Sequence, residues 1–119
     1  GEYYYMADCE TAGKCMEWCK ERLSNTPFDS YDIMYSVASQ TPAGSNGVIF
    51  LPYMRGERAP RWNPDAKGAF LGLTMEHTRG HAVRSILESV ACMLKANLDY
   101  LDVKNMVIFF LKMKLKILK

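Results

Sequence analysis

The sequence lacks a membrane-spanning segment, a secretory signal and a large excess of charge. No run of about 18 uncharged apolar residues occurs, which is the least that a membrane-spanning helix needs, so we expect no membrane partner. The first residues, Gly1-Glu2-Tyr3, are not the basic segment that opens a signal peptide, and we expect a cytoplasmic protein. The formal net charge is only +2, which is too small to indicate nucleic-acid binding.

Cysteines are few, and they lack the spacing of a zinc site. Two of the four, Cys15 and Cys19, lie four residues apart and would share one face of a helix. A zinc site normally needs a second close pair of ligands, and the two histidines lie far along the chain. We therefore expect no metal site, and we expect buried free thiols in a reducing compartment. The cysteines are Cys9, Cys15, Cys19 and Cys92, and the histidines are His77 and His81.

The composition that remains is that of one soluble globular domain with helical and extended patterns. Its 119 residues suit a single domain, and 49% of them are hydrophobic while 24% are charged. Apolar residues at helical spacing predict helices over residues 11–23, 29–40 and 77–101. Short apolar or aromatic runs predict strands over residues 3–6, 48–51 and 68–73. The strand over residues 48–51 is expected to be buried, and Gly47 before it can take a positive φ in a turn. Asp29 or Ser30 is the expected cap of the second helix.

The helix over residues 11–23 carries the first candidate site. Asp8, Glu10 or Thr11 is expected to cap it. Gly13 lies in its first turn, where a residue without a side chain lets a ligand come close to the backbone amides. The alternative is that Gly13 only permits close packing between this helix and a strand. Both interpretations of Gly13 stay open at this point.

The loop over residues 53–67 concentrates positive charge. Arg55, Arg58, Arg61 and Lys67 could together face a phosphate or a carboxylate. The alternative, which we favour, is that Glu57 pairs with Arg58 or another arginine and braces the loop. Trp62 is expected to fill the interior of the loop rather than to serve as a stacking platform.

The helix over residues 77–101 is the longest predicted element, and Thr78 is its expected cap. A lone histidine near a helix start more often packs or makes hydrogen bonds than acts as a general base, so we expect a structural role for His81. Glu88 follows a buried leucine and is expected to make a structural hydrogen bond. The predicted apolar stripe consists of Val83, Ile86, Leu87, Val90, Leu94, Leu98 and Leu101.

One stretch, residues 47–88, carries an ordered series of motifs. In the loop, Leu51-Pro52-Tyr53 is followed by Gly56-Glu57-Arg58-Ala59-Pro60, Trp62, Pro64-Asp65-Ala66 and Gly68. The second motif runs from Gly68 through Phe70, Gly72-Leu73 and His81 to Ser85-Ile86-Leu87-Glu88. This order resembles the C-terminal domain of the FGGY carbohydrate kinases, which include xylulose, gluconate, ribulose and glycerol kinases. Ala82 departs from that family's large aliphatic residue, and Arg61, Asn63 and Lys67 replace the more usual Tyr, Asp and Arg.

The resemblance implies an α/β fold. It would be a partial ribonuclease-H-like domain of the actin-like ATPase kind, with a short mixed sheet packed with helices. Residues 1–105 would form part of the C-terminal domain of a sugar kinase, and residues 106–119 would be a divergent tail that is basic and apolar. The form of the loop resembles the xylulose kinases most.

The resemblance also implies phosphoryl transfer from ATP to a sugar hydroxyl, with a pentulose such as xylulose as acceptor and Mg²⁺ bridging the phosphates in the complete enzyme. Ala12-Gly13 and Glu17-Trp18 resemble the start of the family's nucleotide-side helix. Carried over by position, Gly13 would lie near the phosphates, and Met16 and Glu17 would border the adenosine. The family's catalytic aspartate has no match here, so no catalytic residue is assigned and the chain alone is expected to be inactive.

A second class of function is a non-catalytic interaction or oligomerisation module that has kept the fold. The family's last glycine-rich nucleotide loop is absent from this sequence, and the predicted strands would have lost sheet neighbours. Exposed strand edges and apolar helix faces then favour association, so a homo-oligomer is expected.

Overall fold

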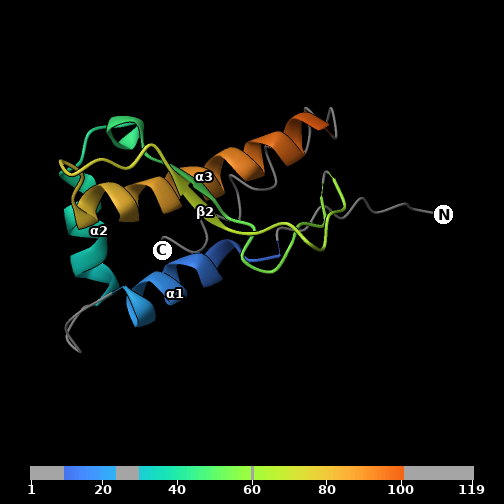
Figure 1. The fold of residues 1–119 in the computed structure, drawn as a ribbon, viewed down its shortest axis with the longest axis horizontal. Coiled ribbons are helices and arrows are strands. Elements are labelled where there is room, and N and C mark those ends of the chain that lie inside the picture. The colour runs from blue at the N-terminus through green and yellow to red at the C-terminus, as the bar shows by residue number, and fades with distance from the viewer. Residues whose placement is uncertain (1–9, 24–29, 60, 101–119) are drawn as a thin grey trace, which may run out of the picture.

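The computed structural model describes residues 10–23, 30–59 and 61–100 (Figure 1). The predicted strand over residues 3–6 and the predicted tail over residues 106–119 lie outside this part. Of the elements present, α3 is central, because α1, α2 and β1 all pack against it. No helix in these three ranges has the length and apolar character that crossing a membrane requires. The elements are α1 (Ala12–Arg22), α2 (Tyr31–Ser39), η1 (Ser45–Gly47, a 3-10 turn), β1 (Ile49–Leu51), β2 (Ala69–Leu71) and α3 (Arg79–Tyr100).

Helix α1 confirms the first predicted helix to within one residue at each end. Its buried face consists of Cys15, Met16 and Cys19, which lie on one side of a helix at this spacing. Burial raises the pKa of the Cys15 and Cys19 thiols, and both are free cysteines as predicted. The expectation of a buried thiol is wrong for Cys92, which is exposed because it lies off the face of α3 that meets the core.

Helix α2 begins where one of the two predicted caps places it. The Ser30 hydroxyl accepts the backbone N–H of Ile33 at 3.3 Å, which satisfies an amide at the free end of the helix. Met34 and Ala38, one turn apart, are buried in the core. Ile33, one position before Met34, is 45% exposed and lies off this buried face.

Strands β1 and β2 form an antiparallel pair in which Phe50 faces Phe70. The two rings lie 4.7 Å apart between centroids and pack toward the core. The neighbouring cross-strand pair, Ile49 and Leu71, faces outward and is about half exposed. Strand 48–51 was expected to be buried along its length. That expectation is wrong at Ile49 because α3 covers only one face of the pair and side chains alternate along a strand.

The sheet of the described residues therefore contains two antiparallel strands. A mixed sheet needs at least one parallel neighbour, and the remaining predicted strand lies outside the described residues. The turn that leads into β1 is tight. Gly47 has a φ of +88°, as expected, and Gly72 has a φ of +79° with a methyl position only 2.6 Å from the Gly47 carbonyl oxygen. Only glycine fits at residue 72 without moving the backbone.

Helix α3 supplies Val83, Ile86 and Met93 to the core at spacings that keep them on one face. Leu94 belonged to the predicted stripe but is 46% exposed. A helix has 3.6 residues per turn, so a stripe extended in strict steps of seven from Leu87 drifts away from the buried face. The Thr78 carbonyl accepts the first helical amides, which puts Thr78 at the predicted cap position.

Arg84 fastens α3 to the end of α2. Its guanidinium donates hydrogen bonds to the carbonyl oxygens of Ala38 at 3.2 Å and Thr41 at 2.7 Å. These oxygens lie at the C-terminal end of α2, where carbonyls have no partner within the helix and a positive charge is favoured. The same guanidinium pairs with Glu88, one turn further along α3, at 2.7 Å.

Glu88 extends this connection to the η1 turn. Its carboxylate accepts the Gly44 N–H and the Ser45 hydroxyl, each at 3.0 Å, as well as the Arg84 guanidinium. The expected structural hydrogen bond of Glu88 is therefore confirmed. Partial burial by itself raises the pKa of this carboxyl, but the hydrogen bonds from Arg84, Gly44 and Ser45 outweigh it and hold the pKa below its ordinary value.

Candidate functional site

The Arg-rich loop, residues 53–67, is closed by its one buried acid. Glu57 is 8% exposed, and its carboxylate accepts the backbone N–H groups of Arg58 at 2.8 Å and Ala59 at 3.1 Å. Its own backbone exchanges two hydrogen bonds with Asn63, each at 2.9 Å. Glu57 braces the loop as predicted, but it does so through backbone amides and not through an arginine side chain.

Trp62 lies on the surface of this loop. The prediction that it fills the loop interior is wrong, because its side chain is 72% exposed. The reciprocal backbone pairing of Glu57 with Asn63 closes the loop without any contribution from Trp62. Gly56, at a φ of +81°, lies so close to the backbone of Pro64 that no side chain would fit between them. The loop is therefore packed through its backbone and carries Trp62 and Arg61 outside.

The loop and Pro52, the residue before it, contact the first turn of α1. The Thr11 hydroxyl donates a hydrogen bond to the carbonyl oxygen of Pro52, and the Cys15 thiol lies 3.8 Å from the same oxygen. Arg58 reaches across and pairs with Glu10 at 2.6 Å. Glu10 had been a candidate for the helix cap, but it precedes the helix and its carboxylate is directed to Arg58 instead.

The first turn of α1 is left open. Thr11 is the cap residue, yet no described side chain accepts a hydrogen bond from the first amides of the helix. Gly13 is exposed, and no described atom lies within 4 Å of the position that a side-chain carbon would take. The described residues thus offer no strand or helix against which Gly13 would permit close packing. This space would admit a ligand, while packing of Gly13 against a strand stays a prediction, because the predicted strand over residues 3–6 lies outside the described residues.

Glu17 lies one turn beyond Gly13 and forms an exposed ion pair with Lys14. The hydrogen bond and charge of Glu17 raise the pKa of Lys14, while Arg55 is near enough to oppose that rise. Arg55 therefore brings positive charge from the loop to this edge of the protein, where Lys14 is already paired with Glu17. Arg58 does not add to it, because Glu10 neutralises its charge.

A hollow of about 290 Å³ begins at Gly13 and extends between the three helices. Its volume is close to the lower end of ligand pockets, which hold roughly 300–1,000 Å³. The rings of Tyr31 and Tyr35 stack at its rim with centroids 6.3 Å apart, and the Lys20 ammonium lies 4.7 Å from the Tyr31 ring. The lining residues are Ala12, Gly13, Met16, Tyr31, Tyr35, Leu87 and Val90.

Two of the three residues predicted to contact a nucleotide, Gly13 and Met16, line this hollow, while Glu17 stands beside it on the exposed side of α1. Sequence reasoning missed the tyrosines. Tyr31 and Tyr35 are four residues apart and so share one face of α2, which is a signal that the sequence does contain. What the sequence does not show is that this face turns toward Gly13.

The two histidines form a separate cluster at the start of α3. His81 Nδ1 accepts the Thr78 N–H at 3.0 Å, and its Nε2 lies 3.0 Å from the Asn46 side-chain Nδ2. His77 repeats the arrangement, with Nδ1 on the Thr74 N–H at 2.9 Å and Nε2 3.1 Å from the Asn46 carbonyl oxygen. Each ring accepts a backbone N–H through its Nδ1, which is the structural role predicted for His81.

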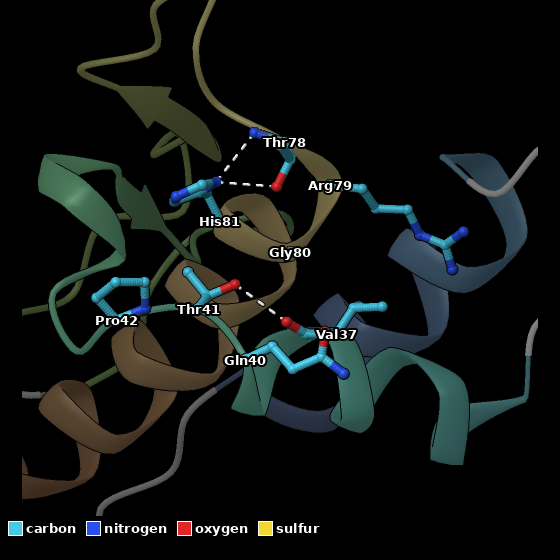
Figure 2. A pocket seen from close by; sticks show the side chains of 8 residues that line it. All are labelled: Val37, Gln40, Thr41, Pro42, Thr78, Arg79, Gly80 and His81. Carbon is cyan, nitrogen blue, oxygen red and sulfur yellow. Dashed lines mark hydrogen bonds between the residues drawn. The ribbon is translucent and has the colours of Figure 1, made fainter.

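A second hollow, of about 400 Å³, lies beside this cluster (Figure 2). Its best-placed polar groups are already used: the Thr41 hydroxyl bonds to the Val37 carbonyl, and His81 bonds to Thr78 (Figure 2). Arg79 extends away from His81 toward α1 (Figure 2). Within the described ranges no three His, Cys, Asp or Glu side chains gather as a metal site would require. The Mg²⁺ that the resemblance implies therefore has no ligand cluster in this part of the chain.

Residues 1–110 match the family model of the C-terminal domain of the FGGY family of carbohydrate kinases. The chain is 38% identical over 86 residues to a gluconokinase of Bacillus subtilis, which covers 66% of this chain and 17% of the relative. It is 35% identical over 99 residues to a xylulose kinase of Escherichia coli, which covers 82% of this chain and 19% of the relative.

Solved structures agree with this assignment. A ligand-bound xylulose kinase from Lactobacillus acidophilus matches 78% of this chain with a TM-score of 0.70 and 35% identity. A glycerol kinase from Plasmodium falciparum, solved with ADP, matches 78% with a TM-score of 0.67 and 32% identity. In both cases the chain covers 18% of the solved protein, so it spans less than a fifth of the relatives it matches. The chain belongs to the FGGY family of carbohydrate kinases, and its described helices and strand pair are part of the α/β, actin-like C-terminal domain of that family.

Proposed function

We propose that this chain forms part of the nucleotide-side wall of the cleft in an ATP-dependent carbohydrate kinase. In this role Gly13 lies against the phosphates of ATP, and Met16 and Glu17 border the adenosine. The single observation that carries the proposal is the open first turn of α1, where no atom of the described residues fills the space at Gly13 and no described side chain caps the amides. Membership of the family supplies the reaction class.

The physical basis is the electrostatics of a helix start. The first amides of a helix carry partial positive charge and have no partner within the helix, so they attract anions. A side-chain cap contributes about 1 kcal/mol to a helix, and α1 forgoes that contribution. Phosphate oxygens would satisfy the same amides, and the absence of a side chain at Gly13 removes the main steric obstacle to them.

The nucleoside would then lie along the hollow between the helices. Met16 gives this hollow an apolar floor, and the stacked rings of Tyr31 and Tyr35 offer a flat apolar wall for a purine. The Glu17 carboxylate stands one turn from Gly13 on the exposed side, where it could accept a hydrogen bond from a ribose hydroxyl. These contacts orient the nucleotide and perform no bond-making step.

In this proposal the binding site for the sugar and the carboxylate that accepts the proton of its hydroxyl lie in the rest of the parent kinase. Xylulose, gluconate and glycerol kinases all appear among the relatives. Membership of the family therefore indicates the class of reaction and does not indicate which sugar is phosphorylated. On the form of its loop we propose a pentulose such as xylulose as the acceptor of the complete enzyme, with Mg²⁺ bound to ATP and a cytoplasmic location. The chain alone is proposed to be inactive.

The experiment that tests this role is ATP binding by the purified chain and by Gly13→Ala, followed by calorimetry at millimolar ATP. The added methyl group meets no described atom, so the variant should fold normally while it obstructs the phosphates. We expect weak binding by the natural sequence and at least tenfold weaker binding by Gly13→Ala. Equal binding by both proteins would contradict the proposal, and so would turnover of xylulose by the chain alone.

A non-catalytic interaction or oligomerisation module is the second candidate, and one observation favours it. The outward face of the strand pair and the segment after it expose Ile49, Leu71, Leu73 and Met75, each by half or more. Apolar residues gathered in this way commonly mark a surface that another protein covers. Light scattering distinguishes the two roles, because a module of this kind forms a stable oligomer at micromolar concentration whether or not ATP is present.

A further inference from the structure

We propose that Thr11 and Arg58 are positioning residues that hold the first turn of α1 against Pro52 and the Arg-rich loop that follows it, so that the amides at Gly13 face the nucleotide. This inference rests on the nucleotide site proposed above. In this role the loop supports the start of α1 and does not bind phosphate through its own charges. Arg58 acts through its ion pair with Glu10 and does not contact the ligand.

Thr11 is the stronger of the two attachments. Its side chain is almost fully buried, with the residue 3% exposed, although it sits at the end of a helix where a hydroxyl usually caps. Instead of capping, the hydroxyl donates to the carbonyl oxygen of Pro52, the residue directly after β1. The Cys15 thiol approaches the same oxygen from one turn further along. Thr11 thus fixes the rotation and height of the helix start relative to the strand pair.

Arg58 makes the second attachment at the other side of the turn. Its guanidinium pairs with Glu10, which immediately precedes Thr11, at 2.6 Å. The Arg58 and Glu10 side chains are 55% and 25% exposed, against 67% and 39% for Lys14 and Glu17, so solvent screens the Arg58–Glu10 pair somewhat less. The two attachments hold consecutive residues, Glu10 and Thr11. Together they restrict rotation of the first turn away from the hollow.

The loop is stiff enough to serve as an anchor. The buried Glu57 carboxylate holds the Arg58 amide itself, and the paired backbones of Glu57 and Asn63 close the loop behind it. Gly56 packs directly on Pro64. These contacts fix the Arg58 backbone within the loop. The ion pair with Glu10 therefore ties the start of α1 to a rigid part of the protein.

The test compares four variants of the purified chain. Thr11→Val keeps the shape of the side chain and removes the donor, while Thr11→Ser keeps the donor. Arg58→Gln removes the charge at the second attachment. Arg61→Gln removes an exposed charge from the same loop and is the matched control. For each protein the amide resonance of Gly13 is recorded without ligand, and the dissociation constant for ATP is measured by titration.

We expect Thr11→Val and Arg58→Gln to shift the free Gly13 resonance and to weaken ATP binding by roughly three- to tenfold, the effect of one misplaced hydrogen-bonding group. Thr11→Ser should restore both readouts, and Arg61→Gln should change neither. An unshifted resonance with unchanged affinity in Thr11→Val and Arg58→Gln overturns the positioning role while the nucleotide site stands. A natural sequence that binds no ATP at millimolar concentration overturns the nucleotide site, and the positioning role falls with it.

Discussion

Replacing Glu88 by alanine should destabilise the protein, because it removes the hydrogen bonds that join α3 to the η1 turn and to Arg84, which contacts the end of α2. Glu88 accepts three hydrogen bonds, from Arg84, from the Gly44 amide and from the Ser45 hydroxyl. Ser45 is fully buried and has a φ of +50°, a backbone conformation that a serine keeps only when its surroundings hold it there. Without the carboxylate, the Arg84 guanidinium also loses its counter-charge.

The size of the effect follows from these contacts. A hydrogen bond to a charged group contributes roughly 1.5–3 kcal/mol net. The Arg84 and Glu88 side chains keep 26% and 32% of their surface exposed, so the lower figure applies and the three bonds do not simply add. We expect the free energy of unfolding to fall by about 3 kcal/mol. In a domain of this size that corresponds to a drop in melting temperature of roughly 12–24 °C.

The chain contains its own control and its own probe. Lys95 and Asp99 form an ion pair with the same spacing on the same helix, but their side chains are 68% and 63% exposed. Asp99→Ala should therefore cost less than about 0.5 kcal/mol. Urea unfolding can be followed by the fluorescence of Trp18, which packs against the core, with Trp62 replaced by phenylalanine throughout because it is largely exposed. If Glu88→Ala costs no more than Asp99→Ala, the reasoning is refuted.

The pH dependence gives an independent check of the same carboxyl group. Folding lowers the Glu88 pKa, so its contribution to stability is complete above its ordinary value of 4.5 and is lost as the pH falls through the lower folded-state value. The difference in stability between the natural sequence and Glu88→Gln should be constant near pH 7 and should shrink on acidification below about pH 4.5. A difference that grew on acidification would have the wrong sign for this account.

Three further predictions concern glycines, cysteines and turnover. Thermal melting should show Gly13→Ala neutral or up to about 1 kcal/mol more stable, because it adds a methyl group in open space on a helix. Gly72→Ala should cost more than about 2 kcal/mol, because it combines a positive φ with a backbone clash. In mass spectrometry after brief alkylation at pH 8, the exposed Cys92 should react well before Cys15 and Cys19, whose thiol pKa values are raised by burial. The chain mixed with ATP and xylulose should release no ADP in a coupled assay, whereas steady turnover would place a catalytic base within it.

Local patterns predicted the helices well. The spacing of Cys15, Met16 and Cys19 marked the buried face of α1, and Ser30 marked the start of α2. Signals of this kind act between residues a few positions apart, so they are legible without the fold. Burial was predicted less well, because Ile49 and Leu94 are apolar but lie on faces that no described element covers. Periodicity shows that an apolar face exists and does not show where its limits fall.

The candidate site could be predicted only in part. Gly13 and Met16 were identified by their resemblance to a helix start in the family, and their place in one hollow fits that assignment. The pairing of Glu10 with Arg58 and the bond from Thr11 to Pro52 join residues more than 40 positions apart. No spacing rule links such residues, and their charges and hydroxyls allow many other partners, so only the folded chain reveals them.

The most direct test of the account is a titration of the isotopically labelled chain with a non-hydrolysable ATP analogue, followed by amide resonances. The account predicts that the Gly13 and Lys14 amides shift most, because they lie at the open first turn of α1, and that the Gly80 and His81 amides beside the second hollow stay unchanged. Shifts confined to Gly80 and His81, or no shift at Gly13 at millimolar analogue, would contradict it.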